Sequence, residues 1–80
     1  MDHKVVSIPK PSYLDKCEYL HVRNGRKVWR STDGKRLYTW DEYHGEIEVF
    51  SAKTKIHLAV ADPLSGKTIK PAVKGRKLYD

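Results

Sequence analysis

The fold of this chain is decided by the stretch Tyr19-Leu20-His21-Val22-Arg23-Asn24-Gly25-Arg26-Lys27-Val28-Trp29-Arg30. Two runs that contain β-branched and aromatic residues flank the pair Asn24-Gly25. Both central residues of a type I′ turn need a positive φ angle, which Asn and Gly adopt at low cost. The stretch therefore predicts a β-hairpin with strands at residues 19–23 and 26–30.

The same succession of strand runs and turn residues continues along the chain. Asp33-Gly34 repeats the turn signal before a strand at 35–40. The remaining pattern predicts a connection at 42–45, a strand at 46–52, a turn at 53–54, a strand at 55–61, a turn at 62–66 and a possible short strand at 67–70. We expect a mainly β fold (α+β at most), namely a small, highly twisted antiparallel sheet of about five strands with meander connectivity.

Residues 1–12 are expected to form an extended N-terminal arm. Pro9 and Pro11 oppose a helix and bias the residues before them toward extended geometry. Ser12 can cap at most one short helical turn over residues 13–15. Because a chain of 80 residues has no room for a second core, we expect a single domain over 1–80.

The charge balance points to an anionic partner. Sixteen Lys and Arg residues against ten Asp and Glu residues give a formal net charge of +6. Such an excess on a small body attracts polyanions, so nucleic acid is the first candidate partner and an acidic protein the second. A membrane surface is third, because no basic amphipathic helix is predicted, and we expect no membrane binding by this domain itself.

Two further features bear on where the chain acts. Cys17 is the single cysteine, which excludes an internal disulfide and suits a reducing compartment. No apolar segment follows Met1 and no long apolar run is present. The sequence therefore predicts neither a signal peptide nor a transmembrane helix, so another element would have to carry the chain across a membrane.

An acidic island lies inside this basic protein. The stretch from Tyr38 to Phe50 contains no Lys or Arg, and it gathers Asp41, Glu42, His44, Glu46 and Glu48. In a strand at 46–50, the two glutamates would share one face, opposite a core face. His44 has the same parity, and Asp41 lies near it across the turn, so one imidazole and up to three carboxylates should cluster.

Such a cluster suits proton transfer on an anionic substrate. A neighbouring carboxylate raises the pKa of an imidazole, so the ring can donate a proton near neutral pH. Carboxylates that lie close together raise one another's pKa, which makes one of them a competent base. RNA cleavage needs a base for the ribose 2′-hydroxyl, an acid for the leaving 5′-oxygen, and a cation for the charge on the phosphorane. The basic segments 23–36 and 67–77 can supply that cation and hold the RNA backbone.

The residues leave other interpretations open. The two glutamates could be an ordinary solvated strand face, and this reasoning alone cannot choose Glu48 over Glu46 as the base. A metal site is less favoured, because the sequence has neither a Cys pair nor His-x-x-x-His spacing. His21 and His57 lie in predicted strands and are assigned structural roles.

Two stretches carry a resemblance to a known family, namely Gly34-Lys35-Arg36-Leu37-Tyr38-Thr39-Trp40-Asp41 and His44-Gly45-Glu46-Ile47-Glu48. In these residues the chain resembles the cytotoxic ribonuclease domain of the rRNA-cleaving colicins and cloacin. The resemblance extends to Trp29 upstream and to His57-Leu58, Asp62-Pro63, Gly66 and Arg76 downstream. The pattern Trp-Asp-x-x-His-Gly-Glu-x-Glu is specific, and the resemblance covers about two-thirds of the chain.

The resemblance implies a role for each matching residue. Glu48 would be the base, His44 the acid, Asp41 the residue that orients His44, Arg76 the transition-state cation and Glu46 a supporting carboxylate. Neither a metal nor another cofactor is implied. The flanking basic segments would bind RNA through Arg26, Lys27, Arg30, Lys35, Arg36, Lys67, Lys70, Lys74 and Lys77.

The resemblance also implies a substrate and a partner. Members of that family cut small-subunit ribosomal RNA near the decoding site, which inhibits translation, and an acidic immunity protein protects the producing cell. The implied site of action is the bacterial cytoplasm of a target cell, after delivery as part of a secreted or cell-surface toxin such as a bacteriocin or a contact-dependent inhibition protein. Residues 1–25, the arm and first strand, lie outside the resemblance, so residues 26–79 would form the catalytic sheet.

Two alternatives remain at this stage. One is a non-enzymatic basic β module that binds RNA or the ribosome. The other is a ribonuclease of the same fold that acts on tRNA or mRNA, because cleavage specificity depends on surface shape and loops that the sequence does not reveal.

Overall fold

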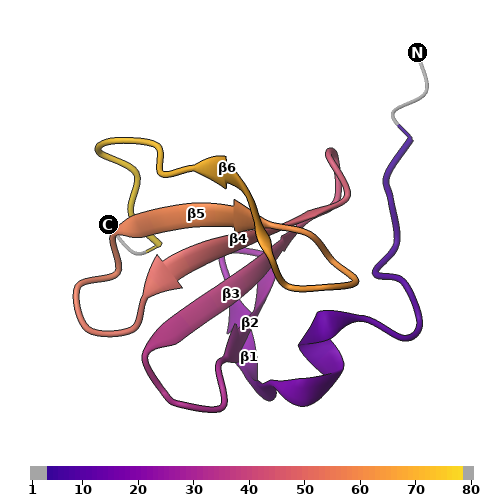
Figure 1. Cartoon of the computed structure of the whole chain (residues 1–80), viewed down its shortest axis with the longest axis horizontal. Helices are drawn as coiled ribbons and strands as arrows, with labels where there is room; N and C mark the ends of the chain where they lie inside the picture. The colour runs from indigo at the N-terminus through magenta and orange to yellow at the C-terminus, as the bar shows by residue number, and fades with distance from the viewer. Residues whose placement is uncertain (1–3, 79–80) are drawn as a thin grey trace.

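The computed structural model describes residues 4–78, so residues 1–3 of the expected arm and residue 79 of the expected sheet lie outside it. One sheet runs in the order β1-β2-β3-β4-β5-β6, with every neighbouring pair antiparallel (Figure 1). Its strands are β1 (Glu18–Arg23), β2 (Arg26–Arg30), β3 (Arg36–Asp41), β4 (Glu46–Ser51), β5 (His57–Ala61) and β6 (Thr68–Pro71). The predicted fold class and meander are confirmed, and the possible last strand forms.

The predicted turn at Asn24-Gly25 is present. The φ angles are 52° at Asn24 and 76° at Gly25, so both residues are left-handed, as a type I′ turn requires. The fifth strand begins two residues later than predicted. Lys55 has a φ of 68° and completes the turn after β4, which leaves Ile56 to form an isolated bridge with Lys77.

The N-terminal segment contains the short helix that Ser12 predicts. The helix η1 (Tyr13–Lys16) is a single 3₁₀ turn. The Ser12 hydroxyl accepts the Leu14 N–H, and the Asp15 carboxylate accepts the Ser12 N–H, which together make a capping box. The buried Leu14 fixes this turn against the sheet.

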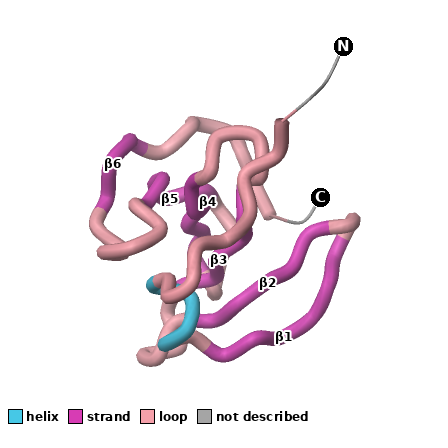
Figure 2. The backbone as a smooth tube through the Cα atoms, turned by 90° about the vertical axis from the view of Figure 1, so that its right-hand side faces the viewer, coloured by secondary structure: helices cyan, strands magenta, loops and turns pink. Residues whose placement is uncertain are grey.

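Three register irregularities make the sheet curl. They lie between Tyr19 and His21 in β1, opposite Val49–Phe50 in β5, and opposite Val60–Ala61 in β6. A bulge bends a strand and increases its twist, so the sheet closes around two small cores. Figure 2 shows the β1–β2 hairpin reaching away from the rest of the sheet as a result.

The two cores lie on opposite faces of the sheet. One face packs under η1 and contains Leu14, Trp29, Tyr38, Ile47, Val49 and Ala61. The other contains the smaller cluster of Val28, Leu37 and Phe50, with Leu20, Ala52 and Leu78 against it. Strand β4 is covered on both faces, because four of its six residues are buried. Ile47 and Val49 point to the core under η1 as predicted, whereas Glu48 points to the second face.

Candidate active site

A cleft of about 790 Å³ opens on the second face of the sheet. One wall is the tip of the β1–β2 hairpin, including Asn24 and Arg26, and the other is the chain from Lys70 to Leu78. The β3–β4 turn lies between these walls, together with the β4 side chains that point to the second face. The cleft therefore brings together segments that are more than fifty residues apart, from Arg23 to Leu78. Asp41, His44, Glu46, Glu48 and Arg76 all line it.

The β3–β4 turn holds His44 through Asp41. One Asp41 carboxylate oxygen accepts the N–H groups of Tyr43 and His44 at 3.0 and 3.2 Å, while the other is 2.8 Å from Nδ1 of His44. Gly45, whose φ is 67°, donates its N–H to the Asp41 carbonyl at 2.8 Å and completes the turn. The His44 side chain is 65% exposed, so its Nε2 edge remains available to a substrate.

The environment of Asp41 favours its ionised form. Partial burial raises its pKa, but the hydrogen bonds from the His44 ring and from the N–H groups of His44 and Tyr43 outweigh this, and the net pKa is lowered. The carboxylate is therefore negatively charged at neutral pH. The Asp41 carboxylate accepts a hydrogen bond from a protonated Nδ1 of His44. In the doubly protonated imidazolium, Nε2 then carries the proton that can be given to a substrate.

Glu48 forms the floor of the cleft, with only 8% of its side chain exposed. Its Oε1 accepts from Nη1 of Arg76 at 2.6 Å, and its Oε2 is 2.8 Å from Nε2 of His57. The N–H of Val73 donates to Nδ1 of His57 at 2.9 Å. Because a backbone N–H can only donate, Nδ1 carries no proton, and the neutral imidazole donates its Nε2 proton to Glu48.

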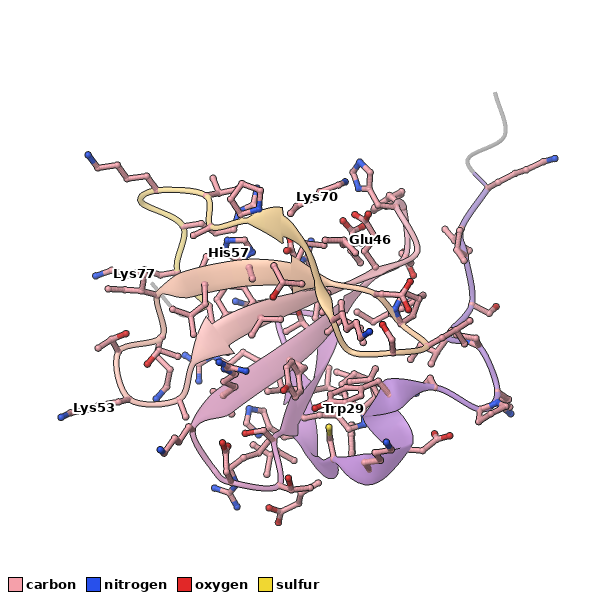
Figure 3. All side chains as sticks on the ribbon, viewed as in Figure 1. Trp29, Glu46, Lys53, His57, Lys70 and Lys77 are labelled. Atoms are coloured by element: carbon pink, nitrogen blue, oxygen red, sulfur yellow. The ribbon has the colours of Figure 1, made fainter. Side chains whose placement is uncertain are left out.

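The two glutamates of the predicted shared face have different surroundings. Glu46 lies nearer the rim, with 16% of its side chain exposed, and accepts from Lys70 Nζ at 2.9 Å. Both side chains are labelled in Figure 3. Glu48 is buried between a guanidinium and an imidazole. A buried carboxylate is retained when charged partners and hydrogen bonds compensate its desolvation. The structure thus distinguishes two side chains that strand alternation made equivalent.

One group of residues could hold a metal ion, contrary to what the sequence spacing indicated. Asp41, His44 and Glu46 each offer a ligand atom, and these atoms lie within 4.8 Å of one another. In the described structure the same groups already have other partners, since Asp41 contacts the His44 ring and Glu46 contacts Lys70. Their arrangement therefore has an explanation that involves no metal, and independence from metal stays a prediction.

The structure divides the predicted RNA-binding cations into two groups. Arg26, Lys70 and Lys77 line the cleft, and Lys27 lines a neighbouring groove. Five others line neither cavity, namely Arg30, Lys35, Arg36, Lys67 and Lys74. Arg30 instead pairs with Glu18 at 2.7 Å. The sequence shows which side chains are basic. Which of them face the cleft depends on how the strands are arranged in the folded sheet.

His57 belongs to the site, although the sequence reasoning gave it only a structural role. It is 1% exposed, so the expected structural role holds, but its partner is the carboxylate assigned as the base. The sequence feature that could have indicated this role is an ionisable side chain inside the apolar run 56–61. A buried imidazole needs polar partners, and here these are Glu48 and Val73. Arg23, which also lines the cleft, was missed as an individual residue.

We expect His57→Phe to destabilise the fold. The substitution keeps a ring beside Phe50 but leaves the Val73 N–H unpaired and removes one donor from Glu48, so the free energy of unfolding should fall by about 1–3 kcal/mol. Urea unfolding followed by tryptophan fluorescence measures this change. The matched control is His57→Gln, whose amide can still donate to Glu48 and should lose less. A His57→Phe protein as stable as the wild type would contradict the assigned hydrogen bonds.

The fold and the site define a class of protein. This is a small basic β domain with a cleft. The cleft combines an imidazole held by a carboxylate with a buried carboxylate–arginine pair, an arrangement suited to acid–base chemistry on an anion. A family described as Cytotoxic matches residues 11–79, and the chain belongs to that family. The resemblance seen in the sequence is thereby confirmed, and the match also takes in residues 11–25, which that resemblance had left out.

Individual relatives agree with this assignment. Over 45 residues, which are 56% of this chain, it is 40% identical to colicin E3 of Escherichia coli. Over the same length it is 38% identical to cloacin and 36% identical to colicin-E6, both also from Escherichia coli. The chain spans about 8% of the length of these curated relatives.

Proposed function

We propose that this domain is a bacterial toxin endoribonuclease that works by general acid–base catalysis. The observation that carries the proposal is the buried Glu48, held by Arg76 and His57 in the same cleft as the Asp41-oriented His44. In this proposal the base, the cation and the acid all face one cavity. Membership of the Cytotoxic family, with colicin and cloacin relatives, supports the toxin assignment.

The proposed reaction is a transesterification that uses the RNA's own 2′-hydroxyl. Glu48 accepts the 2′-hydroxyl proton as the 2′-oxygen attacks phosphorus, and the bond to the 5′-oxygen breaks as that oxygen takes a proton from Nε2 of His44. The products are a 2′,3′-cyclic phosphate and a 5′-hydroxyl end. After cleavage, Glu48 holds one proton more and His44 one proton fewer, so solvent must restore both.

In this scheme Arg76 both pairs with Glu48 and contacts the phosphoryl group of the RNA. One guanidinium N–H engages Glu48, which leaves four of the five donors of an arginine for the phosphoryl oxygens. The Arg76 side chain is 45% exposed, so it bridges the buried base and the open cleft. A cation at this position stabilises the charge that develops in the transition state. No step in the scheme requires a metal.

The proposed substrate is small-subunit ribosomal RNA near the decoding site, and the proposed effect is inhibition of translation. The net charge of +6 and the cations at the rim of the cleft favour a polyanion. An acidic immunity protein is the proposed protective partner. We place the activity in the cytoplasm of a target bacterium, with delivery by a larger secreted or cell-surface toxin. In residues 4–78, no helix has the length and apolar character needed to span a membrane.

Primer extension on ribosomal RNA from ribosomes treated with the pure domain tests this function. We expect one discrete stop near the decoding site. Cleavage of a short protein-free RNA should be unchanged when EDTA is present, because acid–base cleavage by these side chains needs no metal. Ribosomes treated with Glu48→Gln protein are the control. A smear would indicate a nonspecific nuclease, cleavage of tRNA or mRNA alone would indicate a different target, and binding without cleavage would contradict the enzymatic proposal.

A further inference from the structure

A second groove, of about 650 Å³, lies beside the catalytic cleft. One wall is the N-terminal arm from Val5 to Lys10, and the other is the hairpin tip from Asn24 to Lys27. The two cavities share four lining residues, namely Asn24, Arg26, Asp41 and Tyr43. A chain that leaves the cleft over the β3–β4 turn would therefore enter this groove directly.

The arm is fixed to the catalytic turn by specific contacts. The Val6 N–H donates to the Glu42 carbonyl at 2.7 Å, and the Trp40 indole N–H donates to the Val6 carbonyl at 2.8 Å. A Cβ added at Gly45 would lie 3.0 Å from Cγ1 of Val6, so the arm packs closely on the turn. Figure 1 shows the arm running beside this turn. The wall is thus a defined part of the structure.

This wall lies outside the family match, which begins at residue 11. One wall of the groove thus comes from outside the matched residues, and the other, at the hairpin tip, comes from within them. Its cationic side chains come from Lys10, Arg26 and Lys27, and its acidic ones from Asp41 and Glu42. Three cations against two carboxylates leave the groove with a small positive excess, and both Asp41 oxygens are already engaged by the turn.

Tyr43 lies where the two cavities meet. Tyr43 is 62% exposed, and its backbone N–H donates to the Asp41 carboxylate. The turn therefore presents an exposed aromatic ring from an anchored backbone. In residues 4–78 the close aromatic pairs involve other rings, which leaves the faces of the Tyr43 ring without such a partner. Exposed aromatic rings beside cationic grooves are the usual platforms for unpaired bases.

We propose that the second groove binds the single-stranded RNA that flanks the scissile phosphate. A base stacks on Tyr43 as the strand leaves the cleft, and the next phosphates contact Lys10 and Lys27. The arm thus makes the enzyme prefer an unpaired flank on one side of the cut. This inference rests on the proposed ribonuclease function and adds a binding subsite to it.

The test compares kcat/KM for a dinucleotide with kcat/KM for the same dinucleotide extended by single-stranded RNA on the 5′ side or on the 3′ side. For the wild type, one of the two extensions should raise kcat/KM by about tenfold or more. Lys10→Glu and Tyr43→Ala should each lose most of that gain, and Tyr43→Phe should keep it, because Phe retains the stacking face. Lys53→Glu, with the same change of charge on an exposed lysine that lines neither cavity, is the matched control.

Two results would overturn the subsite. One is a wild type that gains nothing from either extension; the other is a gain that survives unchanged in both Lys10→Glu and Tyr43→Ala. Loss of dinucleotide cleavage itself in Lys10→Glu would also overturn it, because the effect would then lie in the cleft or the fold. A wild type that cleaves no RNA of any length would instead refute the proposed function, so the two failures are distinguishable.

Discussion

Glu48→Gln is expected to lower kcat for RNA cleavage by about 10²–10⁴-fold, the range typical of a general base. The amide has nearly the shape of the carboxylate but cannot accept the 2′-hydroxyl proton. It also removes the negative charge that faces Arg76 and accepts from His57 at the floor of the cleft. Single-turnover cleavage of a defined RNA measures the loss, and thermal unfolding shows whether the variant still folds.

Glu46→Gln is the matched control for this variant. It makes the same chemical change on the same strand face, two residues away, where the partner is the half-exposed Lys70. We expect a loss of less than about tenfold, because an exposed ion pair contributes little and a supporting carboxylate does not transfer the proton. Equal losses in the two variants would contradict the assignment of the base, and a larger loss in Glu46→Gln would reverse it.

His44→Ala is expected to slow cleavage of natural RNA by a similar factor, about 10²–10⁴-fold, because the 5′-oxygen would leave without a proton. The diagnostic measurement replaces the leaving nucleoside with a nitrophenol, which departs as a stable anion and needs no acid. On that substrate His44→Ala should recover most of the wild-type rate. Glu48→Gln should not recover, because the 2′-hydroxyl still needs a base.

Asp41→Asn completes the argument about the acid. Since Asp41 is assigned to act through the His44 ring, at 2.8 Å, the two residues should behave as a unit. The double variant should therefore be about as slow as His44→Ala alone, because substitutions within one hydrogen-bonded pair are not additive. Multiplicative losses, or a His44→Ala variant equally impaired on the nitrophenyl substrate, would show that His44 is not the acid.

Much of the architecture follows from local sequence. Asn24-Gly25 predicts its turn because few other pairs adopt two positive φ angles, and Ser12 predicts the start of η1 because its hydroxyl caps a backbone N–H. The proximity of Asp41 and His44 is local in the same sense, since one turn contains both. The sequence pattern of the island also led to the family, and the match over residues 11–79 confirms it.

The remainder of the site is set by contacts between distant residues. Alternation along β4 places Glu46 and Glu48 on one face, but their depth depends on what the curled sheet brings against them. Arg76 reaches Glu48 across 28 residues, and Val73 reaches His57 across 16. The bulges that bend the sheet toward these partners have no strong signature in the sequence.

By itself, then, the sequence determined the strands, the turns, the basic charge and the Asp41–His44 pair, because each depends on residues that are neighbours in the chain. Only the tertiary structure decided that Glu48 is the buried carboxylate, that His57 and Arg76 hold it, and that the arm adds a groove beside it. The physical reason is that burial and long-range hydrogen bonds arise when the sheet closes, and closure depends on the whole chain.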